Sequence, residues 1–338
     1  MGHIQPSYDT NRNVLGKIYP LSTPFNVILD VSEACNFRCE YCFRSQADKK
    51  NWGYARESKF MDWDLFCDVV SQIKEFPEEV RQISLSNHGE PLCNRKLPDM
   101  VRFIKHQGIN SRISIHTNAA MLDEEYAKDL ADSCIDRIVV SLQGLSSEKY
   151  RKVCKSNIDF DSFYHNLTVL YKNKKETQIH FKIMDVALNE GEEDKFYELF
   201  SPIGDRVFVE KMVPIWKDID LPSGIKINSD TDLYNKYGKP FPKQECCPLI
   251  FHTIVVSPVG DVYPCTQLLT PHVLGNIVKQ TLVQLWNCEE RKKLLIRQCE
   301  KNNPDTCTDC FILQNSIYTE EDMIDDYREE IRERLSKI

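Results

Sequence analysis

The residues in this sequence whose type and spacing suggest chemistry are cysteines, of which the chain has fourteen. Cys35, Cys39 and Cys42 lie within eight residues, so one short loop can bring all three thiols to a single metal centre. A cubane iron-sulfur cluster has four irons, so three thiolates leave one iron open, as catalytic zinc sites keep one coordination position open. The spacing therefore predicts a catalytic iron-sulfur centre. A zinc site and three incidental cysteines are the alternatives.

The composition excludes several classes of protein. A formal net charge of −8 and a pI near 5.6 argue against a nucleic-acid binder, because such proteins neutralise phosphates with basic groups. The N-terminal residues lack the apolar segment of a signal peptide, and no run of about 18 apolar residues occurs. We therefore expect a cytoplasmic protein that binds neither membrane nor nucleic acid. Thiols stay reduced in that compartment, which favours metal binding over disulfides.

The elements that must position the cysteines alternate between short β-branched runs and segments of helical period, which is typical of a parallel α/β sheet covered by helices. Six strand-helix units predict a partial (β/α)6 barrel, similar to a TIM barrel but with a wider mouth. The loop over residues 35–60 is too long for an ordinary connection after the first strand. The predicted strands are residues 25–31, 82–86, 112–116, 137–142, 179–184 and 206–211.

Capping signals and apolar spacing locate several helices. Residues 62–76 carry apolar side chains on one helical face, and Pro98 and Gly108 bracket the next helix as start and stop signals. Asp123 is the predicted N-cap of the third helix. Residues 319–335 have an acidic first turn and one apolar stripe, so we expect a helix packed on the body of the protein.

A second, smaller α+β domain is expected after the barrel. It opens with a predicted hairpin over residues 253–265, whose turn reads Pro-Val-Gly-Asp. The predicted division of the chain is an N-terminal extension (1–24), the barrel (25–214), a linker or lid (215–245), the second cysteine domain (246–318) and a C-terminal helix (319–338).

The first cysteine group resembles the signature of the radical S-adenosylmethionine (SAM) superfamily, C-x3-C-x-aromatic-C, with Tyr41 at the aromatic position. The resemblance implies a [4Fe-4S] cluster on Cys35, Cys39 and Cys42 whose open iron binds the amino and carboxylate groups of SAM, with Tyr41 beside the adenine. Electron injection would yield methionine and a 5′-deoxyadenosyl radical, which abstracts hydrogen from an unactivated carbon. The cofactor supplies this chemistry, and the protein supplies position and shielding.

The resemblance extends along the predicted barrel. Residues 88–91, His-Gly-Glu-Pro, resemble the family's GGEP element with His88 replacing the first glycine, which implies that Glu90 binds the methionine ammonium. Short motifs after the third and fourth strands lie where the family contacts the SAM ribose and carboxylate, although each alone is equally a turn or cap. All lie at C-terminal strand ends, where barrel active sites form. The implied cofactor-binding residues are Tyr41, Gly89, Glu90, Asn118, Ser141 and Gln143.

The second cysteine group resembles the SPASM or twitch extension of the same family. Cys247, Gly260 and Cys265 match its opening pattern C-x(9–15)-G-x4-C, and Cys307 and Cys310 form a closing pair. Four thiols imply an auxiliary iron-sulfur cluster, expected as [4Fe-4S], with no open iron. A structural zinc site is the rival interpretation.

Two details of this second group stay open. Cys246 beside Cys247 makes the first ligand ambiguous, although the Cys-Pro context favours Cys247. Cys288 and Cys299 do not match the spacing of a second complete set. We therefore expect the shorter, twitch-like form with a single auxiliary cluster.

Four more residues are candidates for direct roles in catalysis. Cys93 and Cys154 are thiols near the expected radical, and either could donate a hydrogen atom; incidental packing is the alternative. Lys182 and Glu210 occur near strand ends and could act as acid, base or substrate anchor, with a structural salt bridge as the alternative. Two further polar residues share that position, Asp30 and His116.

Three functions fit these observations. The first is hydrogen abstraction from a polar small molecule, such as a sugar, cyclitol or nucleoside alcohol, leading to oxidation or epimerisation. The second is a maturase that modifies a ribosomally made peptide or protein; the 34 residues before Cys35 are few for a fused peptide-recognition domain, which slightly favours the first function. The third is a non-catalytic iron-sulfur or zinc protein. The resemblance also implies a low-potential electron donor, a flavodoxin or ferredoxin.

Overall fold

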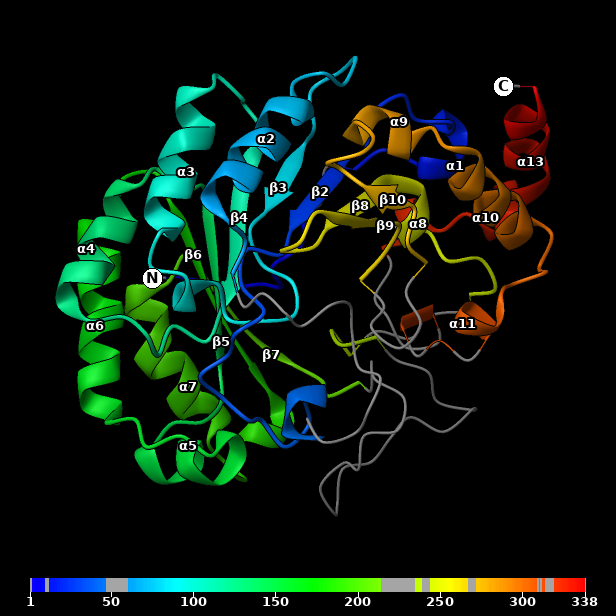
Figure 1. Ribbon diagram of the computed structural model, residues 1–338. Helices are drawn as coiled ribbons and strands as arrows, with labels where there is room; N and C mark the ends of the chain where they lie inside the picture. The colour runs from blue at the N-terminus through cyan, green and yellow to red at the C-terminus, as the bar shows by residue number, and fades with distance from the viewer. Residues whose placement is uncertain are drawn as a thin grey trace.

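The computed structural model describes residues 2–9, 12–46, 60–213, 235–238, 244–266, 272–308, 310, 312–313 and 319–337. Its centre is a ten-stranded sheet with the order β1-β7-β6-β5-β4-β3-β2-β8-β9-β10 (Figure 1). The parallel strands β2 to β7 lie side by side in chain order, so the predicted partial barrel is confirmed. The strands are β1 (His3–Ile4), β2 (Asn26–Leu29), β3 (Gln82–Ser84), β4 (Arg112–Thr117), β5 (Arg137–Leu142), β6 (Gln178–Met184), β7 (Arg206–Glu210), β8 (Thr253–Val256), β9 (Asp261–Tyr263) and β10 (Gly275–Asn276).

Helices follow the strands and cover the outer face of the sheet, as the row of α3, α4, α6 and α7 shows in Figure 1. None of the helices in the described ranges is both long and apolar enough to cross a bilayer. The α-helices are α1 (Leu15–Ile18), α2 (Trp63–Ile73), α3 (Leu97–His106), α4 (Glu124–Asp132), α5 (Ser147–Cys154), α6 (Phe160–Asn173), α7 (Glu193–Phe200), α8 (Leu249–His252), α9 (Leu282–Trp286), α10 (Glu289–Cys299), α11 (Asp305–Thr308) and α13 (Arg328–Ser336). Short 3-10 turns are η1 (Phe43–Gln46), η2 (Pro91–Cys93), η3 (Asp185–Ala187), η4 (Ser201–Ile203), η5 (Glu320–Asp322) and η6 (Asp325–Tyr327).

The predicted helix signals act as expected. Asp123 precedes α4, and its side chain accepts a hydrogen bond from the Tyr126 N–H at 2.8 Å. Pro98 lies in the first turn of α3, and Gly108 follows its end with a φ of +71°, a left-handed conformation that favours glycine. The apolar face of α2 is buried against the sheet through Phe66, Val69, Val70 and Ile73.

The predicted hairpin of residues 253–265 is present, but it continues the barrel sheet. β8 pairs in parallel with β2, so that Asn26 lies opposite Thr253 and Leu29 opposite Val256. β9 then returns antiparallel to β8 through a turn in which Gly260 has a φ of +84°. The two predicted domains therefore share one sheet, and the first strand of the barrel is buried between a strand from each.

The N-terminal residues also belong to the barrel. β1 pairs in parallel with β7, and the chain then turns onto the inner face of the sheet. The Ser7 hydroxyl lies 2.6 Å from His180 Nδ1, and Asp9 accepts hydrogen bonds from Arg137 at 2.8 Å and from Arg112. Because a two-residue strand has no periodicity, this pairing could not be predicted from the sequence.

The helix expected over residues 319–335 is wrong in its first half. The chain there forms η5 and η6, and only α13 is α-helical. Met323 is extended, with φ of −66° and ψ of 132°, because Asp322 is ion-paired with Arg12 and Ile324 is fully buried. Most of the predicted linker or lid, residues 215–245, lies outside the described residues.

We expect Ile254→Ala to lower the free energy of unfolding by about 2–5 kcal/mol, because Ile254 is fully buried on β8. Since β8 and β2 share one sheet, fluorescence and far-UV circular dichroism should report one shifted urea transition. Val278→Ala is the control, because Val278 is 79% exposed and should shift the midpoint little. Separate transitions for the barrel and the C-terminal hairpin would contradict this shared core.

Candidate active site

The loop that carries the first cysteine group is held in place by a distant helix. The N–H groups of Arg38 and Glu40 donate to the carbonyls of Cys154 and Val153, each at 2.9 Å. These carbonyls are at the C-terminal end of α5, where a helix leaves its last carbonyls without internal partners. The end of α5 thereby fixes the loop over the C-terminal edge of the sheet.

The three predicted cluster ligands, Cys35, Cys39 and Cys42, are partly exposed thiols close enough for their charges to interact. Burial raises the pKa of Cys35 and of Cys42 to about 11, although the N–H groups of Phe37 and Arg44 donate to these sulfurs and oppose the rise. Iron binds the thiolate and displaces its proton, and N–H donors stabilise negative charge on sulfur. This donor set fits an iron-sulfur cluster. Within the described ranges no three ligand side chains converge on one point, whereas a cubane spaces its sulfur ligands over its own width.

Glu90 is the buried carboxylate of the site, with 3% of its surface exposed. Its Oε1 accepts hydrogen bonds from the Thr117 hydroxyl and the Leu92 N–H, and Oε2 accepts from the Asn118 N–H at 2.6 Å. Burial raises the pKa of Glu90 to about 7, although these three bonds oppose the rise. A carboxylate with this pKa is partly ionised at neutral pH and can hold an ammonium group by a charge-assisted hydrogen bond. Its contact with the SAM ammonium stays a prediction.

Gly89 allows the Glu90 segment to pass directly against the cysteine loop. A Cβ at this position would lie 1.9 Å from the carbonyl oxygen of Ser32 and 2.8 Å from that of Ala34. The Glu90 N–H also donates to the Ala34 carbonyl at 2.8 Å. Residue 89 must therefore lack a side chain for this contact to form.

The other predicted SAM contacts are brought together in two groups. Asn118 donates from Nδ2 to Asn36 Oδ1 at 2.8 Å, which ties the end of β4 to the cysteine loop. The Tyr41 hydroxyl donates to Gln143 Oε1, and Gln143 Nε2 donates to the Ser141 carbonyl at 3.1 Å. Asn36 and Tyr41 lie on the cysteine loop, Asn118 and Gln143 directly follow β4 and β5, and Ser141 is the last residue but one of β5. Their contacts with SAM stay predictions.

His88, the residue that replaces a family glycine, links the barrel to the C-terminal hairpin. Its Nε2 lies 2.9 Å from the Thr266 carbonyl, and this nitrogen must donate because a carbonyl only accepts. Its Nδ1 lies 3.0 Å from Asn87 Nδ2 and 3.5 Å from the buried Asp30 carboxylate. Because Thr266 directly follows Cys265, His88 connects the two cysteine groups. Sequence reasoning identified His88 only as a departure from the motif.

Cys93 lies at the end of η2, beside the cysteine loop. The Asn36 N–H donates to its sulfur, while burial raises the pKa of the thiol to about 11 and the neighbouring Glu90 and Cys35 add to the rise. The side chain is partly exposed. Its predicted hydrogen-atom transfer is not tested by this placement.

Cys154 lies behind the cysteine loop with no exposed surface. Its Sγ donates to the Tyr150 carbonyl at 3.0 Å. The hydrogen bond between the Cys154 and Cys39 thiols, and then burial, raise the pKa of Cys39. The structure thus places Cys154 in contact with a predicted cluster ligand, and its direct role in catalysis stays a prediction.

Lys182, Glu210 and Lys236 form an ion-paired trio. Glu210 lies 2.9 Å from the Lys182 ammonium and 3.1 Å from that of Lys236. Burial alone would raise the pKa of Glu210, but the two lysine charges outweigh it and hold this pKa at about 2. Glu210 is therefore ionised at neutral pH. Sequence reasoning missed Lys236, which lies in the predicted linker without any motif.

His116 lies on β4 and faces the open interior of the barrel, where solvent reaches it. The enclosing barrel wall, and then the charges of Lys182 and Lys236, lower the pKa of His116 to about 3. Its imidazole is therefore neutral at physiological pH. It can donate or accept a hydrogen bond there but does not add a positive charge.

The second cysteine group gathers beside α10. Cys247 and Cys310 lie in one small apolar cluster with Leu313, and the Cys247 N–H donates to Gln298 Oε1 at 3.0 Å. Cys307 lies on α11, and its carbonyl accepts from the Cys310 N–H at 3.2 Å. Cys265 follows β9 at the end of the hairpin. Their ligation of an auxiliary cluster stays a prediction.

The structure separates the two adjacent candidates for the first auxiliary ligand. Cys246 is fully buried in the apolar core beneath α8, and its thiol is hydrogen-bonded to that of Cys299. This contact, and then burial, raise the pKa of Cys246, and the same hydrogen bond lowers the pKa of Cys299. Cys247 points instead to the cluster that contains Cys310. The geometry favours Cys247 as the ligand.

Comparison with known sequences agrees with this arrangement. The family model of the radical SAM superfamily matches residues 29–200, and that of SPASM, an iron-sulfur cluster-binding domain, matches residues 246–311. The chain is 32% identical over 143 residues to a tungsten-containing aldehyde ferredoxin oxidoreductase cofactor-modifying protein of Pyrococcus furiosus, covering 38% of this chain and 37% of that protein. It is 31% identical over 168 residues to a probable GTP 3′,8-cyclase of Methanococcus vannielii, covering 48% and 50%. The chain thus spans half or less of these relatives.

Solved structures share the fold over most of the chain. BtrN in complex with AdoMet and 2-DOIA superposes with a TM-score of 0.53 at 18% identity, covering 88% of this chain and 97% of BtrN. The protein anSMEcpe with bound AdoMet gives 0.60 at 17% identity, covering 93% and 96%. SuiB of Streptococcus suis bound to S-adenosylmethionine gives 0.59 at 16% identity, covering 88% and 73%. At these identities the likeness shows the fold alone.

The raised pKa of Glu90 predicts pH-dependent stability of the cluster-free protein. Because the folded pKa of about 7 exceeds the ordinary 4.5, the folded state holds a proton between these values that the unfolded state has released. This contribution is fully present below pH 4.5 and is lost as the pH rises through 7, by about 3 kcal/mol in total. We therefore expect Glu90→Gln to lose less stability than the wild type between pH 5 and pH 8 in urea unfolding. Equal losses would contradict the prediction, and the exposed Glu148→Gln serves as control.

Iron content distinguishes the two adjacent cysteines. We expect Cys247→Ala to bind about half the iron of the wild type after anaerobic reconstitution, because it loses an auxiliary [4Fe-4S] cluster and keeps the first. Cys246→Ala should keep the full iron content and lose only stability, because its thiol packs against Cys299. Iron and sulfide assays on the matched pair test this, and the reverse pattern would identify Cys246 as the ligand.

Proposed function

This chain belongs to the radical SAM superfamily and carries an SPASM iron-sulfur domain, and we propose that it abstracts a hydrogen atom from a polar small molecule, such as a sugar, cyclitol or nucleoside alcohol. It is an enzyme that uses a [4Fe-4S] cluster, SAM and an auxiliary cluster. The first three cysteines would hold the catalytic cluster, and Cys247, Cys265, Cys307 and Cys310 the auxiliary one. When bound, the catalytic cluster supplies the electron that cleaves SAM to methionine and a 5′-deoxyadenosyl radical.

The side chains at the strand ends would orient SAM over the cysteine loop. Glu90 is positioned by three hydrogen bonds to accept from the ammonium group. Tyr41, fixed by its hydroxyl bond to Gln143, would lie beside the adenine. Asn118, held by Asn36, would reach the ribose and carboxylate side. Because each of these groups already has a protein partner, little conformational entropy is lost when the cofactor binds.

The ion-paired trio of Lys182, Glu210 and Lys236 is the observation that carries the substrate assignment. These charged groups and the neutral His116 offer hydrogen-bond donors and acceptors near the strand ends of the same barrel. Hydroxyl groups both donate and accept, so a polyhydroxylated molecule satisfies such a mixed lining. After abstraction, loss of one further electron and one proton from the substrate would give oxidation, with the auxiliary cluster as the candidate electron acceptor, and return of a hydrogen atom to the opposite face would give epimerisation. A low-potential flavodoxin or ferredoxin would supply the electron.

A peptide or protein substrate is the alternative. SuiB bound to its precursor peptide SuiA and anSMEcpe bound to a Cp18Cys peptide share this fold, with TM-scores of 0.58 in both cases. These neighbours keep a maturase function open for this chain. A non-catalytic iron-sulfur or zinc protein is no longer an alternative, because the chain belongs to a family of enzymes.

Isotope transfer tests the proposal. The reconstituted enzyme is reduced with dithionite in the presence of SAM and deuterated sugars, cyclitols or nucleosides, and 5′-deoxyadenosine is analysed by mass spectrometry. Deuterium in 5′-deoxyadenosine from a small molecule supports the first function. Transfer only from deuterated peptides would overturn it in favour of the maturase.

We expect Glu210→Gln to lower kcat/KM for deuterium transfer roughly tenfold or more, because a hydrogen bond to a charged group contributes about 1.5–3 kcal/mol. Cleavage of SAM without substrate should continue, since Glu210 does not touch the predicted SAM contacts. Lys211→Gln is the neighbouring control, because the Lys211 side chain is 58% exposed and pairs with Asp185 instead of with the trio. Equal effects in both variants would contradict a substrate-anchoring role.

A further inference from the structure

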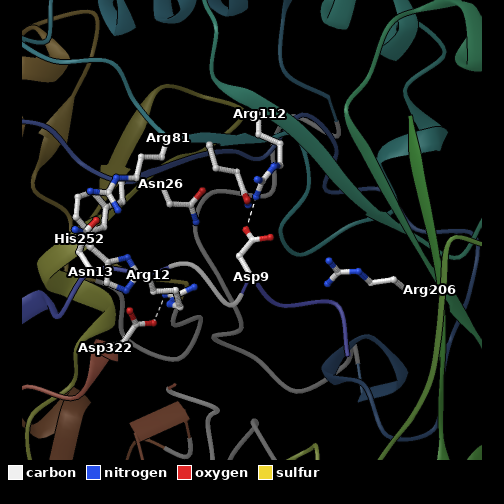
Figure 2. A pocket seen from close by; sticks show the side chains of 11 residues that line it. Asp9, Arg12, Asn13, Asn26, Arg81, Arg112, Arg206, His252 and Asp322 are labelled. Carbon is white, nitrogen blue, oxygen red and sulfur yellow. Dashed lines mark hydrogen bonds and ion pairs between the residues drawn. The ribbon is translucent and has the colours of Figure 1, made fainter. Parts of the chain in front are cut away.

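A polar cavity, called the lower cavity below, lies at the opposite end of the barrel from the cysteine loop. It has a volume of about 460 Å³ and is lined by the first residues of four barrel strands together with N- and C-terminal segments (Figure 2). The strand residues that line it are Asn26, Gln82, Arg112 and Arg206. The cysteines and the predicted SAM contacts follow the other ends of these strands, so the cavity is no part of the site described above.

Side chains fill much of the barrel interior between the two ends. Alternate residues of a strand share one face. On each of these strands the residues two and four positions after the cavity-lining residue therefore also face the interior, and they form a middle level and an upper level toward the cysteine loop. The middle level is largely buried and comprises Ile28, Ser84, Ser114 and Phe208. The upper level comprises Asp30, Ser86, His116 and Glu210, which lie near the candidate active site. A ligand at the lower end would therefore not reach the reacting groups.

The lower cavity has more positive than negative groups. Four arginines line it, against the carboxylates of Asp9 and Asp322. Asp9 pairs with Arg112, and Asp322 with Arg12, as the dashed lines in Figure 2 show. Glu78 and Asp322 attract the Arg81 charge only from a distance at which no ion pair forms among the described residues.

Arg81 and Arg206 have no carboxylate partner in the part of the chain that the structure describes. Arg81 stacks over the Phe25 ring, with its guanidinium carbon 3.5 Å from the ring centroid. Arg206 donates from Nη1 to the carbonyls of Pro6 and Tyr8, at 3.2 and 3.0 Å, and enters the cavity from the side opposite His252 (Figure 2). Burial, and then repulsion from Arg12, lower the pKa of Arg81. Both guanidinium groups thus keep N–H donors for an anion.

Two further features of the cavity point to a ligand. Asn26 Oδ1 is buried and accepts no hydrogen bond from any residue that the structure describes, which is costly for a polar atom unless another donor reaches it. Phe25 and the neutral His252 stack with ring centroids 6.2 Å apart and planes at 27°, which gives the cavity a flat aromatic wall. Burial lowers the pKa of His252. The lining therefore combines anion donors, one free acceptor and a surface for an aromatic or sugar ring.

We propose that this lower cavity is a binding site for a small phosphorylated molecule. Guanidinium groups match the geometry of phosphate oxygens with paired N–H donors, so Arg81 and Arg206 would hold the phosphate. A hydroxyl or amino group of the same molecule would donate to Asn26 Oδ1, and its ring would lie beside the stack of Arg81, Phe25 and His252. The volume is within the range of small-molecule sites. Binding would join the N-terminal segment, the barrel and the C-terminal segment, and would stabilise the folded protein.

The test is calorimetric and thermal titration of the cluster-loaded enzyme under anaerobic conditions. The probes are inorganic phosphate, pyrophosphate and AMP, each against potassium chloride of equal ionic strength. We expect saturable binding and a rise in Tm for at least one probe, with AMP stronger than phosphate if the aromatic wall contributes. No saturable binding of any probe at 10 mM, a concentration of roughly ten times a millimolar Kd, would overturn the proposal.

Matched variants locate the binding. Arg81→Gln and the nearly isosteric Asn26→Asp should each weaken binding at least tenfold, the second by adding a negative charge. Arg332→Gln is the control, because the Arg332 side chain is exposed on α13 and lies 3.9 Å from Glu300. Formation of 5′-deoxyadenosine should be unchanged in all three, which also reports correct folding. Equal affinities in Arg81→Gln and Arg332→Gln would place any phosphate elsewhere and refute the assignment.

Discussion

The whole site depends on the docking of one irregular loop onto the C-terminal edge of a parallel sheet. Cysteines in such a loop have no regular backbone pairing to fix them, so other segments must supply it. The last carbonyls of α5 accept from the N–H groups of Arg38 and Glu40, and the Ala34 carbonyl accepts from the N–H of Glu90. The contact between the Glu90 segment and the loop is possible only because residue 89 has no side chain. The cysteine loop after β2 is thus positioned by residues that follow β3 and β5.

The same sheet also carries the C-terminal cysteine group. β8 lies against β2, so the hairpin that leads to Cys265 starts from the barrel wall beside the strand that leads to Cys35. His88 adds a second connection, because its Nε2–H donates to the carbonyl next to Cys265. Strand pairing and one buried imidazole therefore connect the two cysteine groups, and the hairpin belongs to the barrel core, whereas α8, α10 and α13 pack in a second apolar cluster.

The barrel, its six central strands and the helix caps were predictable because each depends on local patterns. β5 matches the predicted residues 137–142, and the Asp123 cap and the Gly108 stop are formed. The grouping of Cys35, Cys39 and Cys42 was predictable from their spacing, whereas Glu90 and Asn118 were singled out through the resemblance to the radical SAM superfamily. β1, the non-helical start of the C-terminal segment and Lys236 were not, because ion pairs and strand edges far apart in the chain determine them. A single aspartate that pairs with Arg12 outweighs the helical periodicity around it.

The most direct test of a three-cysteine cluster with an open iron is Mössbauer spectroscopy of the enzyme reconstituted with ⁵⁷Fe, with and without SAM. One iron of a [4Fe-4S] cluster should change its isomer shift when SAM is added, while the remaining iron keeps its parameters. The same spectra from a variant in which Cys35, Cys39 and Cys42 are all alanine should lack this iron. Identical spectra with and without SAM, or an unchanged SAM response in the triple variant, would contradict the assignment of these cysteines as the catalytic cluster ligands.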